Sequence, residues 1–333
     1  MKDQSKSLDR ISALPQDTIE KILTHLPIRD ALRTSILSKK WRYCWTKMPK
    51  LVFDDEFARL PYYRDEDFDK YKLVSAIFHV LLLHRGPISE LTLRIVNSEI
   101  IDEIDQIILH LSWRKNIKRF IFELEDDYQL PCSFFSWQGL EHLVLIGDYP
   151  LESTRGYMST FVELFKCLPS VQVVNISWIY TKQFALGGMP QKLPTSLVYL
   201  RILVLELCIH EQHELSSILC VINSSPNLEK IKMTMFPDVG ERETFDTLVD
   251  LQDYSDLKLD HLKELEITSF NNYAPEMEFV KLIMAKSHVL KKARIELNSD
   301  VSVDEEVKML RDLLLLQFPR ASPAAKFIIE RPK

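Results

Sequence analysis

Residues 9–49 read DRISALPQDTIEKILTHLPIRDALRTSILSKKWRYCWTKMP, and this stretch decides how the front of the chain folds. Its apolar residues recur at helical spacing, because Ile19, Leu23 and Leu26 fall on one face of a helix that Pro27 ends. A second helix is predicted over 28–36. A third, from Ser38, places two tryptophans and a methionine on one face. A unit this small cannot bury all these side chains, so the leftover apolar surface predicts a docking module for another protein.

Short runs within this stretch match a known motif. They are Asp9-Arg10-Ile11-Ser12, Leu14-Pro15, Ile22-Leu23, Leu26-Pro27, Asp30-Ala31, Arg33-Thr34-Ser35, Leu37-Ser38 and Lys39-Lys40-Trp41-Arg42, followed by Trp45. With them the chain resembles the F-box, in particular its plant subtype. F-boxes are the helical motifs by which receptor subunits of SCF-type ubiquitin ligases bind a Skp-family adaptor and, through it, a cullin.

The resemblance also implies which side chains bind that adaptor. In the family, the Leu-Pro pair and the apolar faces of the following helices enter the adaptor. The matching positions here are Leu14, Pro15, Ile19, Leu23, Leu26, Ala31, Leu37 and Trp41. For each of them the alternative is packing inside the chain's own core.

Charge is uneven along the chain and favours an acidic partner for this module. Residues 1–50 hold 11 Lys or Arg against 5 Asp or Glu, whereas the remainder holds 31 against 43. A basic helix-turn-helix on DNA would need a polar recognition face, but one face of the third helix consists of Trp41, Trp45 and Met48. We therefore expect an acidic adaptor and no nucleic acid, with the basic side chains speeding encounter.

Composition indicates a globular intracellular protein, in the nucleus and/or the cytoplasm. The chain has 333 residues, of which 46% are hydrophobic and 27% charged. No apolar run approaches the roughly 18–20 residues of a membrane helix, and the N-terminus does not read as a secretory signal. The five cysteines have no C-x-x-C spacing, which is typical of reduced thiols.

A repeat follows the N-terminal module. The pattern Leu-x-x-Leu-x-Leu, with other apolar residues allowed, begins at Ile88, Ile117, Leu140, Val171, Leu200, Leu228, Leu262 and Leu290. Its spacing is that of leucine-rich repeats, in which each strand buries its face by stacking on its neighbours. Helical patterns stand between strands at 158–168 and 214–223. We therefore expect an α/β fold, an irregular solenoid of strand-helix units with a mainly parallel sheet. The ninth position varies among Cys, Asn, Glu, Ile and Phe, which predicts the irregularity.

Alternation along each strand identifies the side chains on the open face of the sheet. In the middle repeats these are His142, Val144, Ile146, Val173, Asn175, Ile202 and Val204. This face is unusually apolar, so it either binds a target protein or is covered by the protein's own loops. In later repeats Lys230 and Lys232, Glu264 and Glu266, and Lys292 and Arg294 alternate in sign. They predict two rows of cross-strand ion pairs.

The last segment resembles the FBD domain that follows such repeats in plant F-box proteins. The matching runs are His261-Leu262-Lys263, Ile267 with Phe270, Glu278-Phe279-Val280-Lys281, Leu290-Lys291-Lys292 and Arg320-Ala321-Ser322-Pro323. Strands are predicted at 262–268, 291–297 and 327–329, and helices at 276–286 and 304–317. The expected organisation is an F-box over 1–50, a linker and helix over 51–87, repeats over 88–259, and an FBD over 260–333 that caps the solenoid.

The motifs of common enzymes are missing. Seven glycines occur, and none forms a phosphate-binding loop or a nucleophile elbow. Residues 210–214 read His-Glu-Gln-His-Glu. A helical zinc site of the H-E-x-x-H kind needs a histidine at position 214, where this chain has Glu. We therefore expect no catalytic residue, metal or cofactor, but a substrate receptor of a ubiquitin ligase. The alternative is a repeat scaffold that binds the adaptor without directing degradation.

Overall fold

The computed structural model describes residues 10–54, 57, 70–95, 101–113, 116–124, 128, 130–147, 160–185, 190, 192–207, 212–236, 254, 256–299, 302–314, 322 and 325–332. Within them, ten strands form one sheet in chain order, and every neighbouring pair is parallel. The strands are β1 (Lys50–Phe53), β2 (Glu90–Ile95), β3 (Arg119–Leu124), β4 (His142–Gly147), β5 (Val173–Ile176), β6 (Ile202–Leu207), β7 (Lys230–Met235), β8 (Glu264–Phe270), β9 (Lys292–Leu297) and β10 (Lys326–Glu330). The expected α/β solenoid is confirmed.

All eight predicted repeats begin a strand in this sheet. The central apolar residue of each repeat pairs in register with that of the next, and all are buried. They are Leu91, Phe120, Leu143, Val174, Leu203, Ile231, Leu265 and Ala293. Alternate side chains of a strand point to opposite faces, so these residues build a continuous core beneath the sheet.

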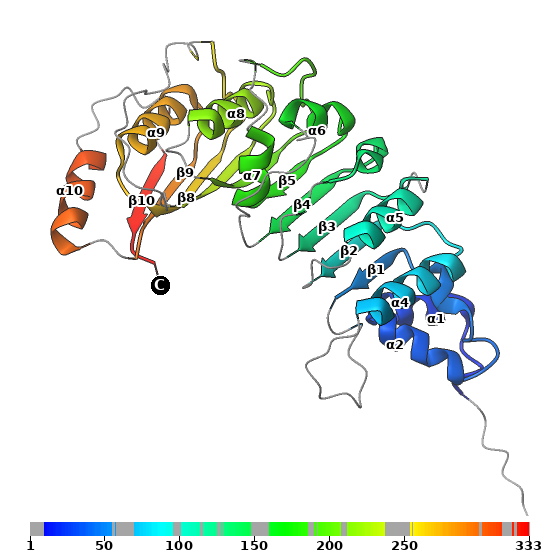
Figure 1. The fold of residues 1–333 in the computed structure, drawn as a ribbon. Coiled ribbons are helices and arrows are strands. Elements are labelled where there is room, and N and C mark those ends of the chain that lie inside the picture. Colours follow the sequence, from blue (N-terminus) through cyan, green and yellow to red (C-terminus); the bar gives the residue numbers. More distant parts are fainter. Residues whose placement is uncertain are drawn as a thin grey trace, which may run out of the picture.

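Helices cover the core face of the sheet, and within the described residues no helix lies on its other face, the open face. The helices that follow the strands are α4 (Lys70–Leu83), α5 (Ile101–Ser112), α6 (Phe161–Cys167), α7 (Trp178–Ala185), α8 (Gln212–Asn223), α9 (Ala274–Lys286) and α10 (Val303–Leu314), with the 3₁₀ turn η4 (Cys132–Ser136). Figure 1 shows α5, α6, α8 and α9 along the outer side of the curved sheet. The helices expected at 158–168 and 214–223 correspond to α6 and α8; α5 and α7 were not expected.

The N-terminal module differs from expectation in its third segment. Helix α1 (Gln16–Thr24) ends before Pro27, as predicted, and α2 (Ile28–Arg33) continues into a 3₁₀ turn, η1 (Thr34–Ile36). The third segment is not an α-helix, because it consists of turns and the 3₁₀ helix η2 (Cys44–Lys47). Its predicted apolar stripe is nevertheless buried: Trp41, Cys44, Trp45 and Met48 all join the core.

The sheet begins earlier than the sequence indicated. Strand β1 lies in the segment assigned to a linker, and its Lys50 and Phe53 pair with Glu90 and Leu93 of β2. Packing of α2 on η2 and β1 makes the module continuous with the solenoid. The amides of Arg85 and Gly86, just after α4, both donate to the carbonyl of Thr46 in η2 at 2.8 and 3.0 Å. Most of the acidic stretch 54–71 lies outside the described residues.

The C-terminal segment has the predicted order of elements: β8, α9, β9, α10 and β10 fall where strands and helices were expected. Strand β8 has a register shift between Ile267 and Phe270, and Ser269 and Asn272 have positive φ values of 58° and 63°. The turn is held by Glu276, whose carboxylate accepts from the amides of Asn271 and Tyr273 at 2.9 and 3.2 Å. The sharp β8–α9 turn therefore depends on one buried carboxyl group.

Candidate binding surfaces

An exposed apolar surface lies on the N-terminal module. Ile36, at the end of η1, is 88% exposed, and its neighbour Leu37 is 46% exposed. Ile11, Ile22 and Tyr43 add further exposed apolar area. The resemblance to the F-box placed Leu37 in the adaptor-binding set but missed Ile36. The signal was available, because Ile36 stands directly between the matching runs Arg33-Thr34-Ser35 and Leu37-Ser38.

The eight predicted adaptor-binding residues divide into two groups. Pro15 and Leu37 are exposed, and Leu14 and Leu26 are partly exposed, so these four present side-chain surface. The other four are buried in the core of the chain, namely Ile19, Leu23, Ala31 and Trp41. In this structure the buried group supports the surface from below rather than forming it. Direct contact of these four side chains with a partner would require the module to open.

Hydrogen bonds fix the N-terminal loop against the third segment. The Trp41 indole Nε1 donates to the carbonyl of Ile11 at 3.2 Å, and the Lys40 ammonium donates to the carbonyl of Leu14. The Ser35 hydroxyl donates to the carbonyl of Arg42 at 3.0 Å. The loop that bears the Leu-Pro pair is thus held to the rest of the module before any partner binds, which lowers the entropic cost of association.

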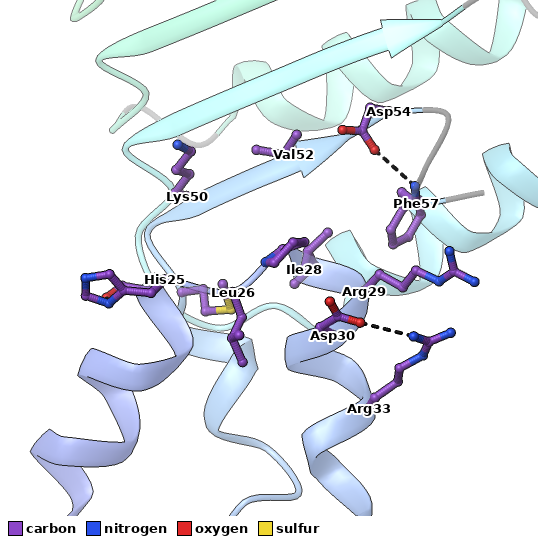
Figure 2. A pocket seen from close by; sticks show the side chains of 13 residues that line it. His25, Leu26, Ile28, Arg29, Asp30, Arg33, Lys50, Val52, Asp54 and Phe57 are labelled. Carbon is purple, nitrogen blue, oxygen red and sulfur yellow. Dashed lines mark hydrogen bonds and ion pairs between the residues drawn. The ribbon is translucent and has the colours of Figure 1, made fainter. Parts of the chain in front are cut away.

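A cavity of about 540 Å³ lies between the end of α1, helix α2 and the first strand. Figure 2 shows apolar side chains of Leu26, Ile28 and Val52 around it, with charged groups at its ends. Arg33 pairs with Asp30 at 3.1 Å, and Asp54 accepts from the amide of Phe57 at 3.0 Å. The cavity's size falls in the range of small-molecule sites, but these ion pairs and hydrogen bonds already engage charged groups around it within the chain.

The predicted target-binding residues come together on the open face of the sheet. Register places Val144 of β4 beside Asn175 of β5, which lies beside Val204 of β6. A second row runs from His142 to Val173 and Ile202. These residues and Ile146 all keep partial exposure, so the apolar face is not buried by the described part of the chain. Ile121 of β3 extends the patch and was missed, because β3 was not included among the middle repeats.

Charged side chains flank this patch in an ordered way. The row nearest the strand beginnings holds Lys50, Glu90, Arg119, Lys230, Glu264, Lys292 and Lys326, and the row nearest the strand ends holds Arg94, Glu123, Glu206, Glu296 and Glu330. Cations therefore outnumber carboxylates along the strand beginnings, and the reverse holds along the strand ends, among the residues described. The electrostatic potential of the open face is therefore more positive along the strand beginnings than along the strand ends.

The predicted ion-pair rows are confirmed on β7, β8 and β9. Lys230 pairs with Glu264 at 3.0 Å, Lys232 with Glu266 at 3.9 Å, and Arg294 with Glu266 at 2.7 Å. Hydrogen bonding from Lys230 lowers the pKa of Glu264, as does its positive charge. These pairs offset the charges of Lys230, Lys232 and Arg294 on the later strands.

The buried thiol of Cys220 is not activated as a nucleophile. Desolvation raises the pKa of the Cys220 thiol to about 11, although a hydrogen bond with Ser224 acts in the opposite direction. A thiol held in the protonated form is a poor nucleophile and a poor metal ligand. Among the described residues, no group of three or more His, Cys, Asp or Glu side chains is arranged to hold a metal ion.

Comparison with known proteins identifies both ends of the chain. The F-box domain family matches residues 11–53, and the FBD family matches residues 259–295. The chain carries an F-box domain at its N-terminal end and an FBD near its C-terminal end. No helix in the described part of this F-box protein is both long and apolar enough to cross a membrane.

Relatives of this F-box protein occur in the plant Arabidopsis thaliana. One F-box/FBD/LRR-repeat protein is 28% identical over 418 residues, covering 97% of this chain and 99% of the relative. Another of that name is 40% identical over 89 residues, 27% of this chain and 19% of the relative. An FBD-associated F-box protein is 30% identical over 219 residues, 61% of this chain and 46% of the relative. The first match therefore spans the F-box, the repeats and the FBD together.

Proposed function

We propose that this F-box protein is the substrate-receptor subunit of an SCF-type ubiquitin ligase. The observation that carries the proposal is the exposed apolar surface at Ile36 and Leu37, on the domain that binds Skp-family adaptors in F-box proteins generally. Exposed apolar surface on a domain whose relatives bind a partner indicates where that partner docks. The adaptor would in turn connect the chain to a cullin inside the cell.

The adaptor surface consists of direct contacts and their support. Leu14, Pro15, Leu26 and Leu37 of the expected set, together with Ile36, would contact the adaptor. Ile19, Leu23, Ala31 and Trp41 keep the contact residues in position from the core. Lys and Arg side chains around this surface would attract an acidic adaptor and raise the association rate more than the affinity.

The receptor would act by proximity and would make no covalent bond itself. The F-box core continues into the first strands through Trp45 and Met48, and α2 packs on β1. A continuous core of this kind holds the adaptor and the repeats in one relative orientation. A target on the repeats would then have a high effective concentration near the conjugating enzyme that the cullin carries.

Adaptor capture tests this proposal directly. The full chain, co-expressed with a tagged Skp-family adaptor, should copurify with it, and the double variant Ile36→Asp/Leu37→Asp should lose at least about 90% of the capture because two carboxylates would enter an apolar interface. Leu82→Asp/Leu83→Asp is the matched control, since these adjacent leucines of α4 are 70% and 52% exposed but lie outside the F-box. Equal capture by both double variants would overturn the proposed contact surface.

The scaffold alternative needs a second readout. A receptor directs ubiquitin to a bound protein, whereas a scaffold only binds the adaptor. Reconstitution with adaptor, cullin and conjugating enzyme should therefore give ubiquitin chains on proteins that copurify with the wild-type chain and not with the Ile36→Asp/Leu37→Asp variant. Adaptor capture without any such transfer, and without accumulation of a bound protein when the chain is removed from cells, would favour the scaffold.

A further inference from the structure

The open face of β3 to β6 combines three features that together indicate which kind of ligand it would bind. It has an aliphatic patch, a polar amide at the centre of that patch, and a cation at one border. The aliphatic residues are Ile121, Val144, Ile146, Val173, Ile202 and Val204, and all are partly exposed. Neighbouring strands lie about 4.8 Å apart, so four strands span about 14 Å, which is roughly four or five residues of an extended chain.

Asn175 is the amide at the centre. Its neighbours in the same row are Val144 and Val204, which have no polar side-chain atoms to offer it. Among the described residues, the Asn175 side chain makes no hydrogen bond. An amide side chain carries both donors and an acceptor, and the backbone of an extended peptide presents both as well. A helix uses its backbone groups internally, so it could not satisfy this amide in the same way.

Arg119 is the cation at the border. The carboxylates around it are engaged elsewhere, because Glu90 pairs with Lys50 at 4.0 Å and Glu123 with Arg94 at 2.8 Å. Within the described residues Arg119 forms no ion pair. Register places it beside His142, at the strand beginnings where cations outnumber carboxylates. A guanidinium in this position suits a carboxylate, which it can bind with two parallel hydrogen bonds.

The opposite border does not offer the same opportunity. Lys230 of β7 is already paired with Glu264, and the Glu206 carboxylate accepts from the amide of Trp178 at 3.3 Å. The charge that a ligand can satisfy is therefore on the β3–β4 side, and its sign is positive.

From these features we infer that the open face of β3 to β6 binds an extended peptide segment with aliphatic side chains and a carboxylate. The aliphatic side chains lie on the Val144 and Val204 row. The carboxylate reaches Arg119, and a backbone amide or carbonyl of the segment pairs with Asn175. The inference rests on the proposed receptor function, and it gives the chemistry of the target segment.

Designed peptides of 12 residues test it. The first set carries two Val or Ile at alternate positions and a Glu two residues away; the second replaces Glu with Lys, and the third replaces Val or Ile with Ser. The full chain, copurified with its Skp-family adaptor, should bind the first set about tenfold more tightly than either other set, because one charge pair or two buried aliphatic groups contribute about that much.

Charge reversal gives the sharpest arm of the experiment. Arg119→Glu should invert the preference, so that the Lys set binds better than the Glu set. Lys326→Glu is the matched control, because it makes the same charge change in the same row on β10, away from the patch. Val144→Asp should abolish binding of the first set, whereas Val289→Asp, an exposed valine outside the sheet, should leave it unchanged.

The role of Asn175 is tested by a pair of changes. The backbone amides of a bound peptide are N-methylated one at a time. Methylation at one peptide position should weaken binding to the wild-type chain, and methylation at that position should not weaken binding to the Asn175→Ala variant any further. Equal binding of the three sets, a preference unchanged by Arg119→Glu, or tighter binding of single-stranded RNA would overturn the inference. Adaptor capture measured on the same preparation separates these outcomes from failure of the proposed receptor function.

Discussion

Gly86 approaches Lys47 so closely that a β-carbon on the glycine would lie 2.8 Å from the Lys47 Cα atom. The contact joins the end of the F-box to the loop before β2, where the amides of Arg85 and Gly86 donate to Thr46. Because the obstructing atom is backbone, it cannot rotate away as the end of a side chain can. A glycine at this position allows the F-box and the first strands to share one core.

Gly86→Ala should therefore destabilise the junction. We expect the free energy of unfolding to fall by about 1–3 kcal/mol, the usual cost of forcing an extra carbon into a packed site. Thermal unfolding monitored by near-UV circular dichroism would measure it, because Trp41 and Trp45 lie in the adjoining core. Arg85→Ala is the control, since it leaves the same backbone in place. Identical melting temperatures of Gly86→Ala and wild type would show that the backbone at the junction shifts to make room for the added carbon.

The strands were predictable because burial on one face of a parallel solenoid imposes a fixed spacing. Leu203 and Ile231, for example, follow Leu200 and Leu228 by three residues and are fully buried. Strand β1 obeys the same rule, since Met48, Leu51 and Phe53 have the same spacing and are all buried. The sequence did not reveal it because Met48 also completes the helical stripe of Trp41 and Trp45. One residue served two patterns.

Helix α7 was missed because it stands where the repeat pattern predicted a turn. Helix α7 begins two residues after β5, so Ile179 occupies a helix where the repeat pattern expected the ninth position of a strand-turn unit. At the ninth position of the last repeat, the Asn298 side-chain amide donates to the Asn271 side chain of the repeat before it, at 2.6 Å. Glu125 and Cys208, two other ninth-position residues, lie outside the described part of the chain.

The binding surfaces were predictable in type more than in detail. Strand alternation alone put Val144, Asn175 and Val204 on one face, and the structure places them in one row. For the F-box, sequence periodicity marks apolar positions but does not separate a side chain packed inside from one that faces a partner. Leu23 and Leu37 carry the same side chain, yet one is buried and the other exposed, because only tertiary packing decides between them.

Glu276 should make stability depend on pH. Burial raises the pKa of this carboxyl from 4.5 to about 7, against the opposing hydrogen bonds from the Asn271 and Tyr273 amides. Between these two pKa values the folded state holds a proton that the unfolded state has lost. The contribution of the protonated carboxyl to the free energy of unfolding is therefore fully present below about pH 4.5 and is lost as pH rises through 7. The loss amounts to roughly 3 kcal/mol at most.

Glu276→Gln isolates this effect, because the amide keeps an acceptor oxygen without the charge. The melting temperature of the variant relative to wild type should rise between pH 5 and pH 8. Glu278→Gln, on the same helix with its side chain 42% exposed, provides the comparison and should give no such trend. Parallel curves for Glu276→Gln and wild type would contradict a buried neutral carboxyl at this turn.

Arg294 holds three carboxylates near the C-terminal edge of the sheet. It pairs with Glu266 at 2.7 Å and with Glu296 at 2.8 Å, and it also pairs with Glu330 of β10. Arg294→Gln would leave these carboxylates without that cation, so we expect a lower melting temperature at neutral pH and low salt. Added sodium chloride should recover part of the loss by screening the repulsion. Lys326→Gln removes one positive charge from the next strand, and a drop of equal size there would indicate net charge rather than this cluster.

Trp41 links the core of the F-box to its binding surface, and two substitutions separate its roles. Trp41→Phe keeps a buried ring but loses the hydrogen bond to the Ile11 carbonyl, which should cost about 0.5–1.5 kcal/mol. Trp41→Ala also creates a cavity, and it should cost about 3–5 kcal/mol and release the F-box from the core. Adaptor capture should fall moderately with Trp41→Phe, because the loop carrying Leu14 and Pro15 loses one anchor but keeps others, such as the Lys40 ammonium on the Leu14 carbonyl. Denaturant unfolding and capture measured on the same preparations would test both statements. Full capture by Trp41→Phe despite the expected loss of stability would mean that the loop is positioned without the Trp41 hydrogen bond.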